Sequence, residues 1–410
     1  MDTEGLRRRS EVATKEKLDL GAGASAEVAE PHPAGKIKHG VPVQILRAVA
    51  SLGVSLASMC VIHVTQILGS PLYFWNKDYY YAWIALTKQS FAIIVTMITQ
   101  FFSPTLIRVS WDPSVRGQFR KTGDGRLETR FPERMILMSN HQIYTDWIYL
   151  WWMAYTSRMH GHVYIILKES LRYIPVLGPG MMFFGFIFMA RKWASDKPRL
   201  AHRLKQLRTK HSGPYSGTEG LDPMWLYIFP EGTNLSANTR KKSVAWSQKS
   251  GIPDMKHLLL PRATGMHFCL SELKDSIDWV YDCTVAYEGV PPGGYAQDYF
   301  SLRSTFLQGR PPKSVNFYWR RFAVSEIPKE QSVFEQWIED RWREKDEFLE
   351  QYNTTGRFPA DEPTKEAPSY VETAVKLISW PEIVQPYIVM VTAGLILNII
   401  RMLWNRFSSG

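Results

Sequence analysis

Three long apolar runs stand apart from the rest of the chain. No Asp, Glu, Lys or Arg occurs from Ala48 to Asn76, from Gln89 to Ile107, or from Ile383 to Ile400. At about 1.5 Å per residue the last run would be roughly 27 Å long as a helix, close to the thickness of the hydrocarbon layer. We therefore expect a membrane-anchoring helical hairpin within residues 41–110 and a C-terminal transmembrane segment at 383–404.

The link between the first two runs is the aromatic stretch DYYYAWIALTK. Two apolar helices with such a link predict a hairpin in or across the membrane. The alternative is a pair of helices buried in a protein core, which apolar composition also allows.

Between these runs, short β-type segments alternate with longer helical or polar ones. The candidate strands are RMILMS, HVYIIL, GFIFMA, WLYIF, WVYDCTVAY and SVNFYW, and a helix is expected from Pro328 to Tyr352. Alternation of this kind predicts an α/β domain with a mixed sheet flanked by helices, here over residues 130–352. Residues 1–40 are expected to be a disordered tail, and residues 353–382 a linker, from their composition.

Charge and cysteine content narrow the class of protein. The formal net charge of +10 favours anionic partners, which include nucleic acid, anionic lipid and phosphorylated cofactors. No nucleic-acid-binding module is recognisable, so we favour lipids and coenzyme A. Three scattered cysteines are too few for a disulfide framework and fit a reducing compartment. The Arg and Lys residues that follow Ile107 indicate that the α/β domain faces the cytosol.

The most informative local pattern is Asn140-His141-Gln142-Ile143-Tyr144-Thr145-Asp146, between a predicted strand and a predicted helix. Residues five apart lie about 140° apart on one helix, so His141 and Asp146 cannot share a helical face. They can converge if His141 lies in the turn and Asp146 in the first helical turn, where a carboxylate is favoured. An imidazole oriented by a carboxylate is a good general base. The alternative is a pair that only stabilises a loop.

Other strand ends carry further candidate groups. The turn Pro230-Glu231-Gly232-Thr233-Asn234 follows WLYIF, and its carboxylate and free N–H groups suit a hydroxyl and a phosphate, although an ordinary β-turn would look the same. Arg191 follows GFIFMA, and its guanidinium suits phosphate. The pair His160 and His162 lacks companion ligands, so we expect a surface position and no metal site. The basic run KPRLAHRLKQLRTK fits either a solvated helix face or contact with anionic headgroups or coenzyme A phosphates.

In this order the blocks resemble the glycerolipid acyltransferase family. The first resembles the family's His-x-x-x-x-Asp motif, the second its Gly-x-x-x-Ile-x-Arg block, the third its Phe-Pro-Glu-Gly-Thr block and the fourth, LLLPR, its apolar-Pro block. The resemblance covers roughly residues 88–352. Segments such as HQIYTDWIYLWW, FPEGTNLSANTRKKS and VYDCTVAY are similar to the lysocardiolipin and lysophosphatidylinositol acyltransferase branch.

The resemblance implies the family fold and an acyl-CoA-dependent transfer to a lysophospholipid, at the endoplasmic reticulum membrane. It implies that His141 is the general base, that Asp146 orients it, and that no cofactor or metal is needed besides acyl-CoA as co-substrate. The implied substrate-binding residues are Asn140, Lys168, Arg191, Glu231, Gly232, Thr233, Asn234, Pro261 and Arg262. Asn234 departs from the family, because many members have Arg there.

Alternatives of other kinds stay open. The acceptor could be lysophosphatidic acid, as in phosphatidic acid synthesis. A non-catalytic lipid-binding membrane scaffold would keep the fold but would not need both His141 and Asp146. A lipid hydrolase would use His141 to activate water. The expected partners are acyl-CoA, a lysophospholipid and the bilayer, with no nucleic acid, and the sequence indicates no protein partner.

Overall fold

A computed structural model describes residues 31–217, 220–360 and 370–408. In these residues an eight-stranded sheet has the order β10-β1-β9-β8-β4-β7-β5-β6. The six predicted strands all form, and β1 and β10 join them at one edge. The strands are β1 (Leu106–Trp111), β4 (Arg134–Ser139), β5 (Val163–Lys168), β6 (Ile187–Met189), β7 (Met224–Ile228), β8 (Trp279–Tyr287), β9 (Ser314–Ala323) and β10 (Tyr370–Ala374).

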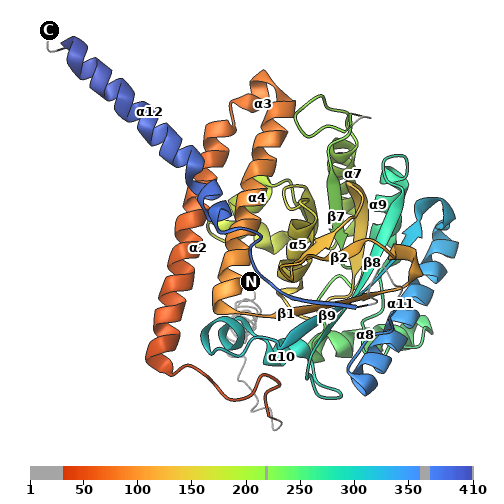
Figure 1. The fold of residues 1–410 in the computed structure, drawn as a ribbon. Helices are drawn as coiled ribbons and strands as arrows, with labels where there is room; N and C mark the ends of the chain where they lie inside the picture. The colour runs from red at the N-terminus through yellow and green to blue at the C-terminus, as the bar shows by residue number, and fades with distance from the viewer. Residues whose placement is uncertain (1–30, 218–219, 361–369, 409–410) are drawn as a thin grey trace, which may run out of the picture.

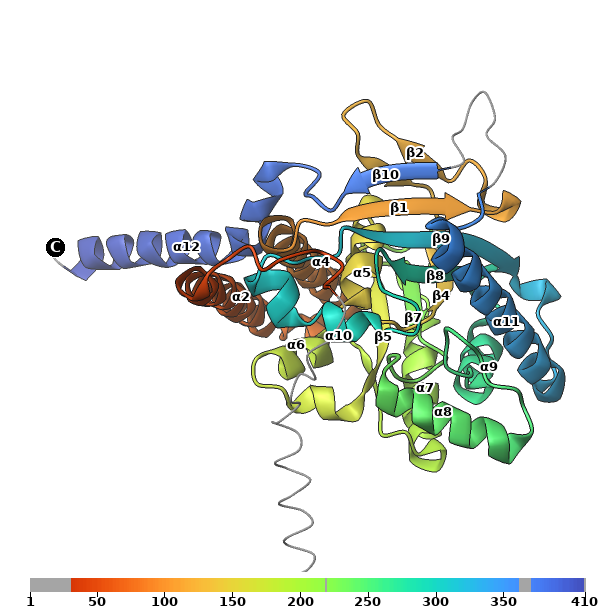
Figure 2. The ribbon, with the colours of Figure 1, turned by 90° about the horizontal axis from the view of Figure 1, so that it is seen from below.

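The sheet is mixed, as predicted. Strands β8, β4, β7, β5 and β6 are mutually parallel, β9 runs antiparallel to β8, and β10 runs antiparallel to β1. A separate two-stranded ribbon, β2 (Phe119–Lys121) and β3 (Leu127–Thr129), lies beside β10 (Figure 2). The carboxyl ends of the parallel strands meet at one end of the sheet, where binding sites of α/β proteins form.

Helices cover both faces of the sheet (Figures 1 and 2). Alternate residues of β4 show the two cores: Met135 and Leu137 pack with α4 and α5, and Ile136 and Met138 pack with α7, α9 and α11. The helices are α2 (Val41–Gly69), α3 (Leu72–Trp75), α4 (Lys77–Phe102), α5 (Asp146–Thr156), α6 (Leu177–Phe183), α7 (Trp193–Leu207), α8 (Ala237–Ser250), α9 (Ala263–Leu273), α10 (Ala296–Tyr299), α11 (Gln331–Thr355) and α12 (Gln385–Ser408).

Two expectations differ from the structure. The aromatic stretch expected as the hairpin link is helical and belongs to α4, because Asn76 caps that helix by accepting hydrogen bonds from Asp78 N and Tyr79 N. The sheet also extends beyond residues 130–352: β1 follows the hairpin directly, and β10 lies in the segment expected to be a linker. The predicted tail lies mostly outside the described residues.

Three helical segments among the described residues are long and apolar enough to cross a membrane, namely Val41–Trp75, Lys77–Phe102 and Trp380–Met402. Their burial differs greatly. The most apolar stretch of α4 is 61% buried within the protein, whereas the corresponding stretches of α2 and α12 are 22% and 6% buried. Thus α2 and α12 present apolar surface, and Figure 1 shows α12 projecting away from the body.

Polar contacts fasten α4 to the domain along its length. At its first turn, the Asp78 carboxylate accepts hydrogen bonds from Ser212 N (2.9 Å) and Ser212 Oγ (2.8 Å), and lies 2.7 Å from His211 Nδ1. Midway, the buried Lys88 ammonium donates to Val163 O (3.3 Å). Asp78 lies in the first turn of α4, next to the short connection between α2 and α4 (residues 70–76), so this connection lies beside the domain.

Candidate active site

His141 and Asp146 converge at the carboxyl end of β4. His141 lies in the turn after the strand, and Asp146 is the first residue of α5. His141 Nδ1 lies 2.8 Å from Asp146 Oδ2. The His141 side chain is 20% exposed and that of Asp146 is fully buried. With Nδ1 directed at the carboxylate, Nε2 on the other side of the ring is left for a substrate.

Asp146 accepts hydrogen bonds from three further donors. Its Oδ2 accepts from Gln142 N (2.6 Å) and Ile143 N (3.1 Å), and its Oδ1 accepts from the Tyr287 hydroxyl (2.5 Å). Burial, with the neighbouring Asp146 carboxylate, holds the pKa of Tyr287 well above its ordinary value, so the phenol keeps its proton and donates it. These donors fix the carboxylate in one orientation. Sequence reasoning missed Tyr287, which lies at the end of β8.

The Asn140 side chain connects two neighbouring strands by hydrogen bonds. Its Nδ2 donates to Val285 O (3.0 Å), its Oδ1 accepts from Val285 N (2.7 Å), and the residue is fully buried. Both polar ends of the amide are thereby used within the protein. This placement differs from the predicted contact with substrate: Asn140 joins the end of β4 to β8 and so positions the turn that carries His141.

The turn after β7 packs directly beside His141. The Phe229 ring lies 4.6 Å from the imidazole between centroids, and Leu235 N donates to His141 O (2.8 Å). Glu231 is buried, and its Oε1 accepts from His141 N (3.3 Å). Burial raises the pKa of Glu231 to about 8. Glu231 therefore supports the backbone of His141 from within the protein.

Two exposed arginines flank this turn. Arg191 Nη2 donates to Gly232 O (2.6 Å), and a Cβ added at Gly232 would lie 3.7 Å from Cδ of Arg262. Arg191 itself has φ of 66°, in the left-handed region. Buried Asp196 holds that conformation by accepting from Ala190 N (2.8 Å) and Lys192 N (2.9 Å). Asp196 was not predicted, although an acid in the first turn of a helix is a recognisable signal.

The remaining predicted residues lie at the same end of the sheet with different exposure. Asn234 is buried, and its Nδ2 donates to Gln297 Oε1 of α10. Thr233 is half-buried beside it. Pro261 is also half-buried, and the next residue ties the fourth block to the third, since Arg262 N donates to Pro230 O (2.8 Å). Lys168 is exposed at the end of β5, in register with Met189.

The expected surface position of His160 and His162 is wrong. Both are 6% exposed, and their rings contact Tyr155 and Tyr215 edge-on. Burial lowers the pKa of each to about 3, so both are neutral at physiological pH. They fill space at the opposite end of the sheet, where β5 begins, because a neutral imidazole packs like an aromatic ring.

The site therefore holds a partly exposed imidazole oriented by a buried carboxylate, with two arginines beside an open glycine turn. Such an arrangement can take a proton from a hydroxyl group and hold an anionic group nearby. The order of blocks matches a defined sequence family. A family model described as Acyltransferase matches residues 119–287, and one described as Acyltransferase C-terminus matches residues 305–380.

Curated relatives support the same assignment. An uncharacterized acyltransferase of Schizosaccharomyces pombe is 40% identical over 341 residues, which cover 82% of this chain and 93% of that protein. The 2-acyl-1-lysophosphatidylinositol acyltransferase of Saccharomyces cerevisiae is 36% identical over 356 residues, or 80% and 89% of the two chains. Lysocardiolipin acyltransferase 1 of Gallus gallus is 32% identical over 239 residues, or 58% and 57%. The chain belongs to the glycerolipid acyltransferase family, and the predicted resemblance is confirmed.

Proposed function

We propose that this acyltransferase moves a fatty acyl group from acyl-CoA to the free hydroxyl of a lysophospholipid. The observation that carries the proposal is the imidazole of His141, held through Nδ1 by Asp146 while its side chain remains 20% exposed. The similarity to lysophospholipid acyltransferases of two kinds supports the substrate class. We further propose that acyl-CoA is the only co-substrate and that no metal or other cofactor takes part.

In the proposed reaction, Nε2 of His141 takes the proton of the acceptor hydroxyl as its oxygen attacks the thioester carbonyl carbon. Asp146 stabilises the imidazolium that forms. The C–S bond then breaks, the proton passes from the imidazolium to the departing thiolate, and the products are a diacyl phospholipid and free coenzyme A. No acyl-enzyme forms. Arg191 and Arg262 are proposed to hold the phosphate of a substrate beside Gly232.

For the acceptor we propose a lysophospholipid whose phosphate carries a further head group, with lysophosphatidylinositol first and lysocardiolipin second. A phosphomonoester such as lysophosphatidic acid carries nearly one more negative charge and would favour an additional arginine. Position 234 instead holds a neutral Asn, whose amide donates to Gln297. An arginine at this position would have to displace Gln297, so the wild-type turn is built around a neutral side chain.

The test uses the purified full chain with one acyl-CoA and a panel of lyso acceptors, with products identified by mass spectrometry. His141→Ala should lower turnover by about 10²–10⁴ or more, and a matched control, His267→Ala on α9, should keep wild-type turnover. Near-normal turnover by His141→Ala would contradict the general-base role. Acyl-CoA consumption without an acceptor would indicate a hydrolase. A clear preference for lysophosphatidic acid would overturn the proposed acceptor.

We also propose that the protein resides in the endoplasmic reticulum membrane with the catalytic domain in the cytosol, where acyl-CoA is made. Support comes from the exposed apolar surfaces of α2 and α12 and from the cations that follow Ile107. Fluorescence microscopy of the tagged full chain against organelle markers tests the compartment.

A further inference from the structure

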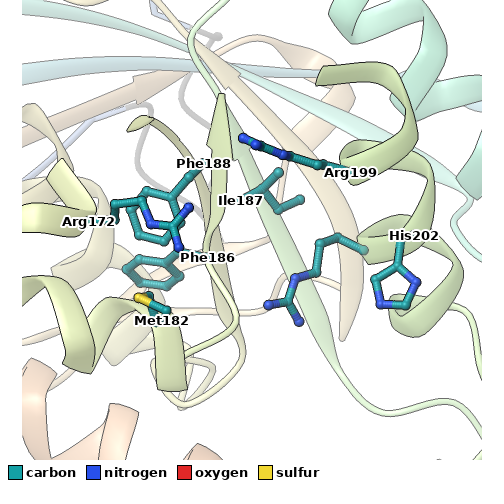
Figure 3. A pocket seen from close by; sticks show the side chains of 8 residues that line it. Arg172, Met182, Phe186, Ile187, Phe188, Arg199 and His202 are labelled. Atoms are coloured by element: carbon teal, nitrogen blue, oxygen red, sulfur yellow. The ribbon is translucent and has the colours of Figure 1, made fainter. Parts of the chain in front are cut away.

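A pocket of about 260 Å³ opens beside β6, at the edge of the main sheet, and His141 does not line it. Its wall is formed by the segment before α6, by α6 itself, by residues 186–188 at β6 and by α7. Figure 3 shows Arg172, Phe186 and Met182 on one side of the strand and Arg199 and His202 on the other. The lining residues are Arg172, Met182, Phe186, Ile187, Phe188, Arg199, His202 and Arg203.

The basic groups of the pocket exceed the acidic ones near them. Arg199, His202 and Arg203 are spaced three and four apart, so they share one face of α7. Glu169 pairs with Arg199 (2.6 Å) and lies 3.8 Å from Arg172. Within the described parts of the chain, no carboxylate lies within 4 Å of the Arg203 guanidinium, which donates to Gln206 Oε1 (2.8 Å). Among the described residues, Glu169 is thus the one carboxylate within 4 Å of the three guanidinium groups, which lie beside an aromatic and aliphatic floor.

The apolar side of the pocket is continuous with the membrane-facing part of the molecule. Met182 belongs to α6, which packs against α2: His63 of α2 contacts Val176 O (2.5 Å), and a Cβ added at Gly180 would lie 3.2 Å from Met59. The chain around α6 also exposes large apolar side chains to solvent, namely Tyr173, Ile174, Leu177 and Met182. An apolar surface beside α2, bordered by arginines, matches the boundary between acyl chains and headgroups.

We infer that this pocket binds the phosphate of an anionic phospholipid from the membrane in which α2 lies. Arg203 and Arg172 contact the phosphate from the two walls, and the first carbons of the acyl chains lie on Met182 and Phe186. Free phosphate would use the same cations but would gain nothing from the apolar floor. The inference does not rest on the proposed acyl transfer, because it concerns binding at a separate place.

The experiment measures lipid retention on the purified full chain in a zwitterionic detergent by native mass spectrometry. Short-chain phosphatidylserine and short-chain phosphatidylcholine are titrated in parallel. We expect phosphatidylserine to be retained preferentially. Arg203→Gln should weaken its retention about tenfold, because a charge-assisted hydrogen bond is lost. Lys205→Gln removes an equal charge from the same helix, about 200° further round, and should leave retention unchanged.

Several outcomes would overturn the inference. Equal retention of the two lipids would show no recognition of charge, and equal weakening by Arg203→Gln and Lys205→Gln would show only diffuse attraction. Competition by inorganic phosphate at the same concentration as the short-chain lipid would assign the pocket to free phosphate. A higher KM for acyl-CoA in Arg203→Gln, with lipid retention unchanged, would assign it to coenzyme A. If Arg203→Gln does not fold, as judged by thermal unfolding, Arg172→Gln from the opposite wall carries the same test.

Discussion

Asp146 is held from both of its oxygens, and the Tyr287 hydroxyl is the donor to Oδ1. We expect Tyr287→Phe to lower kcat about tenfold, because one hydrogen bond that fixes the carboxylate is removed. The loss of this donor also leaves Asp146 a stronger partner for a protonated imidazole. The acidic limb of the pH–rate profile should therefore move to higher pH.

The readout is kcat/KM measured across the pH range, with Tyr149→Phe as the control, since Tyr149 is buried beside Tyr287 and does not donate to Asp146. A kcat/KM reduced equally at every pH, with no displacement of the acidic limb, would limit Tyr287 to a packing role.

The buried Glu231 makes the stability of the folded protein depend on pH. Its pKa is about 8 when folded, against an ordinary value near 4.5, so the folded state retains a proton that the unfolded state releases between these values. Stability attributable to this residue is therefore present below about pH 4.5 and falls as pH rises towards 8. Glu231→Gln should remove this pH dependence. Between pH 5 and pH 7.5, the free energy of unfolding of the variant should therefore rise relative to that of wild type by on the order of 1–3 kcal/mol.

Thermal unfolding of both proteins at the two pH values checks this expectation. Parallel pH dependence in wild type and Glu231→Gln would mean that Glu231 is ionised in the folded protein.

At the residue scale, much of the site could be predicted because its blocks are local in sequence. His141 and Asp146 are five residues apart, and the strand-to-helix boundary between them is visible in the apolar pattern. Tyr287 and Gln297 could not be predicted, because their partners lie 141 and 63 positions away and only the packed sheet brings them together. Asn140 was visible as part of the first block, but its two bonds to Val285 depend on the neighbouring strand.

Among the elements, α11 is fastened to the sheet by buried charges. Lys345 Nζ lies 2.5 Å from Asp282 Oδ1 and donates to Cys283 O (2.7 Å), and Arg320 lies 2.8 Å from Asp282 Oδ2. Burial lowers the pKa of Lys345, while Asp282 opposes that shift. Lys345→Met should destabilise the fold by roughly 3–5 kcal/mol, because Asp282 loses one of its two buried cations.

The measurement is chemical denaturation of the purified full chain. The double variant Lys345→Met/Asp282→Asn should recover part of the loss, because no unbalanced carboxylate remains. If the double variant loses more free energy of unfolding than the two single variants lose together, the pairing of Lys345 with Asp282 is contradicted.

At this scale the sequence predicted the strands well and their flanks less well. Short runs such as WVYDCTVAY are bounded by polar turns, and β8 covers that run completely. β10 was not predicted, because YVETA is short and follows a linker-like composition; pairing with β1 decides its conformation. The aromatic residues 79–81 were assigned to a link, yet α4 includes them because Asn76 starts the helix earlier.

For the whole molecule, the connection between α2 and α4 determines whether the hairpin can cross the membrane. Asp78, next to the connection between α2 and α4 (residues 70–76), accepts a hydrogen bond from Ser212 N of the catalytic domain. We therefore expect this connection and the domain to lie on the same side of the membrane. An engineered cysteine at Phe74, which is 90% exposed, should react with an impermeant reagent from the same side as one at Lys121. Labelling of sealed microsomes compares the two.

Labelling of position 74 only after the vesicles are opened would show that the hairpin crosses the membrane completely. Both variants are made in a Cys60→Ser background, because this substitution removes the exposed native thiol.

The pairing of β1 with β10 has a consequence for how the protein is made. β1 leaves the ribosome early, yet its outer partner, in register from Leu106↔Ala374 to Ser110↔Tyr370, is translated some hundreds of residues later. At roughly 5–20 residues per second the β1 edge would stay unpaired for tens of seconds, and an open strand edge invites pairing with other chains. β10 ends at Ala374 and α12 begins at Gln385, so the two are made within about a second of each other at this rate. Insertion of the last apolar helix and closure of the sheet are therefore nearly simultaneous, and a chain that stalls before this point would present both an unpaired strand and an unfinished membrane anchor to the cell's chaperones.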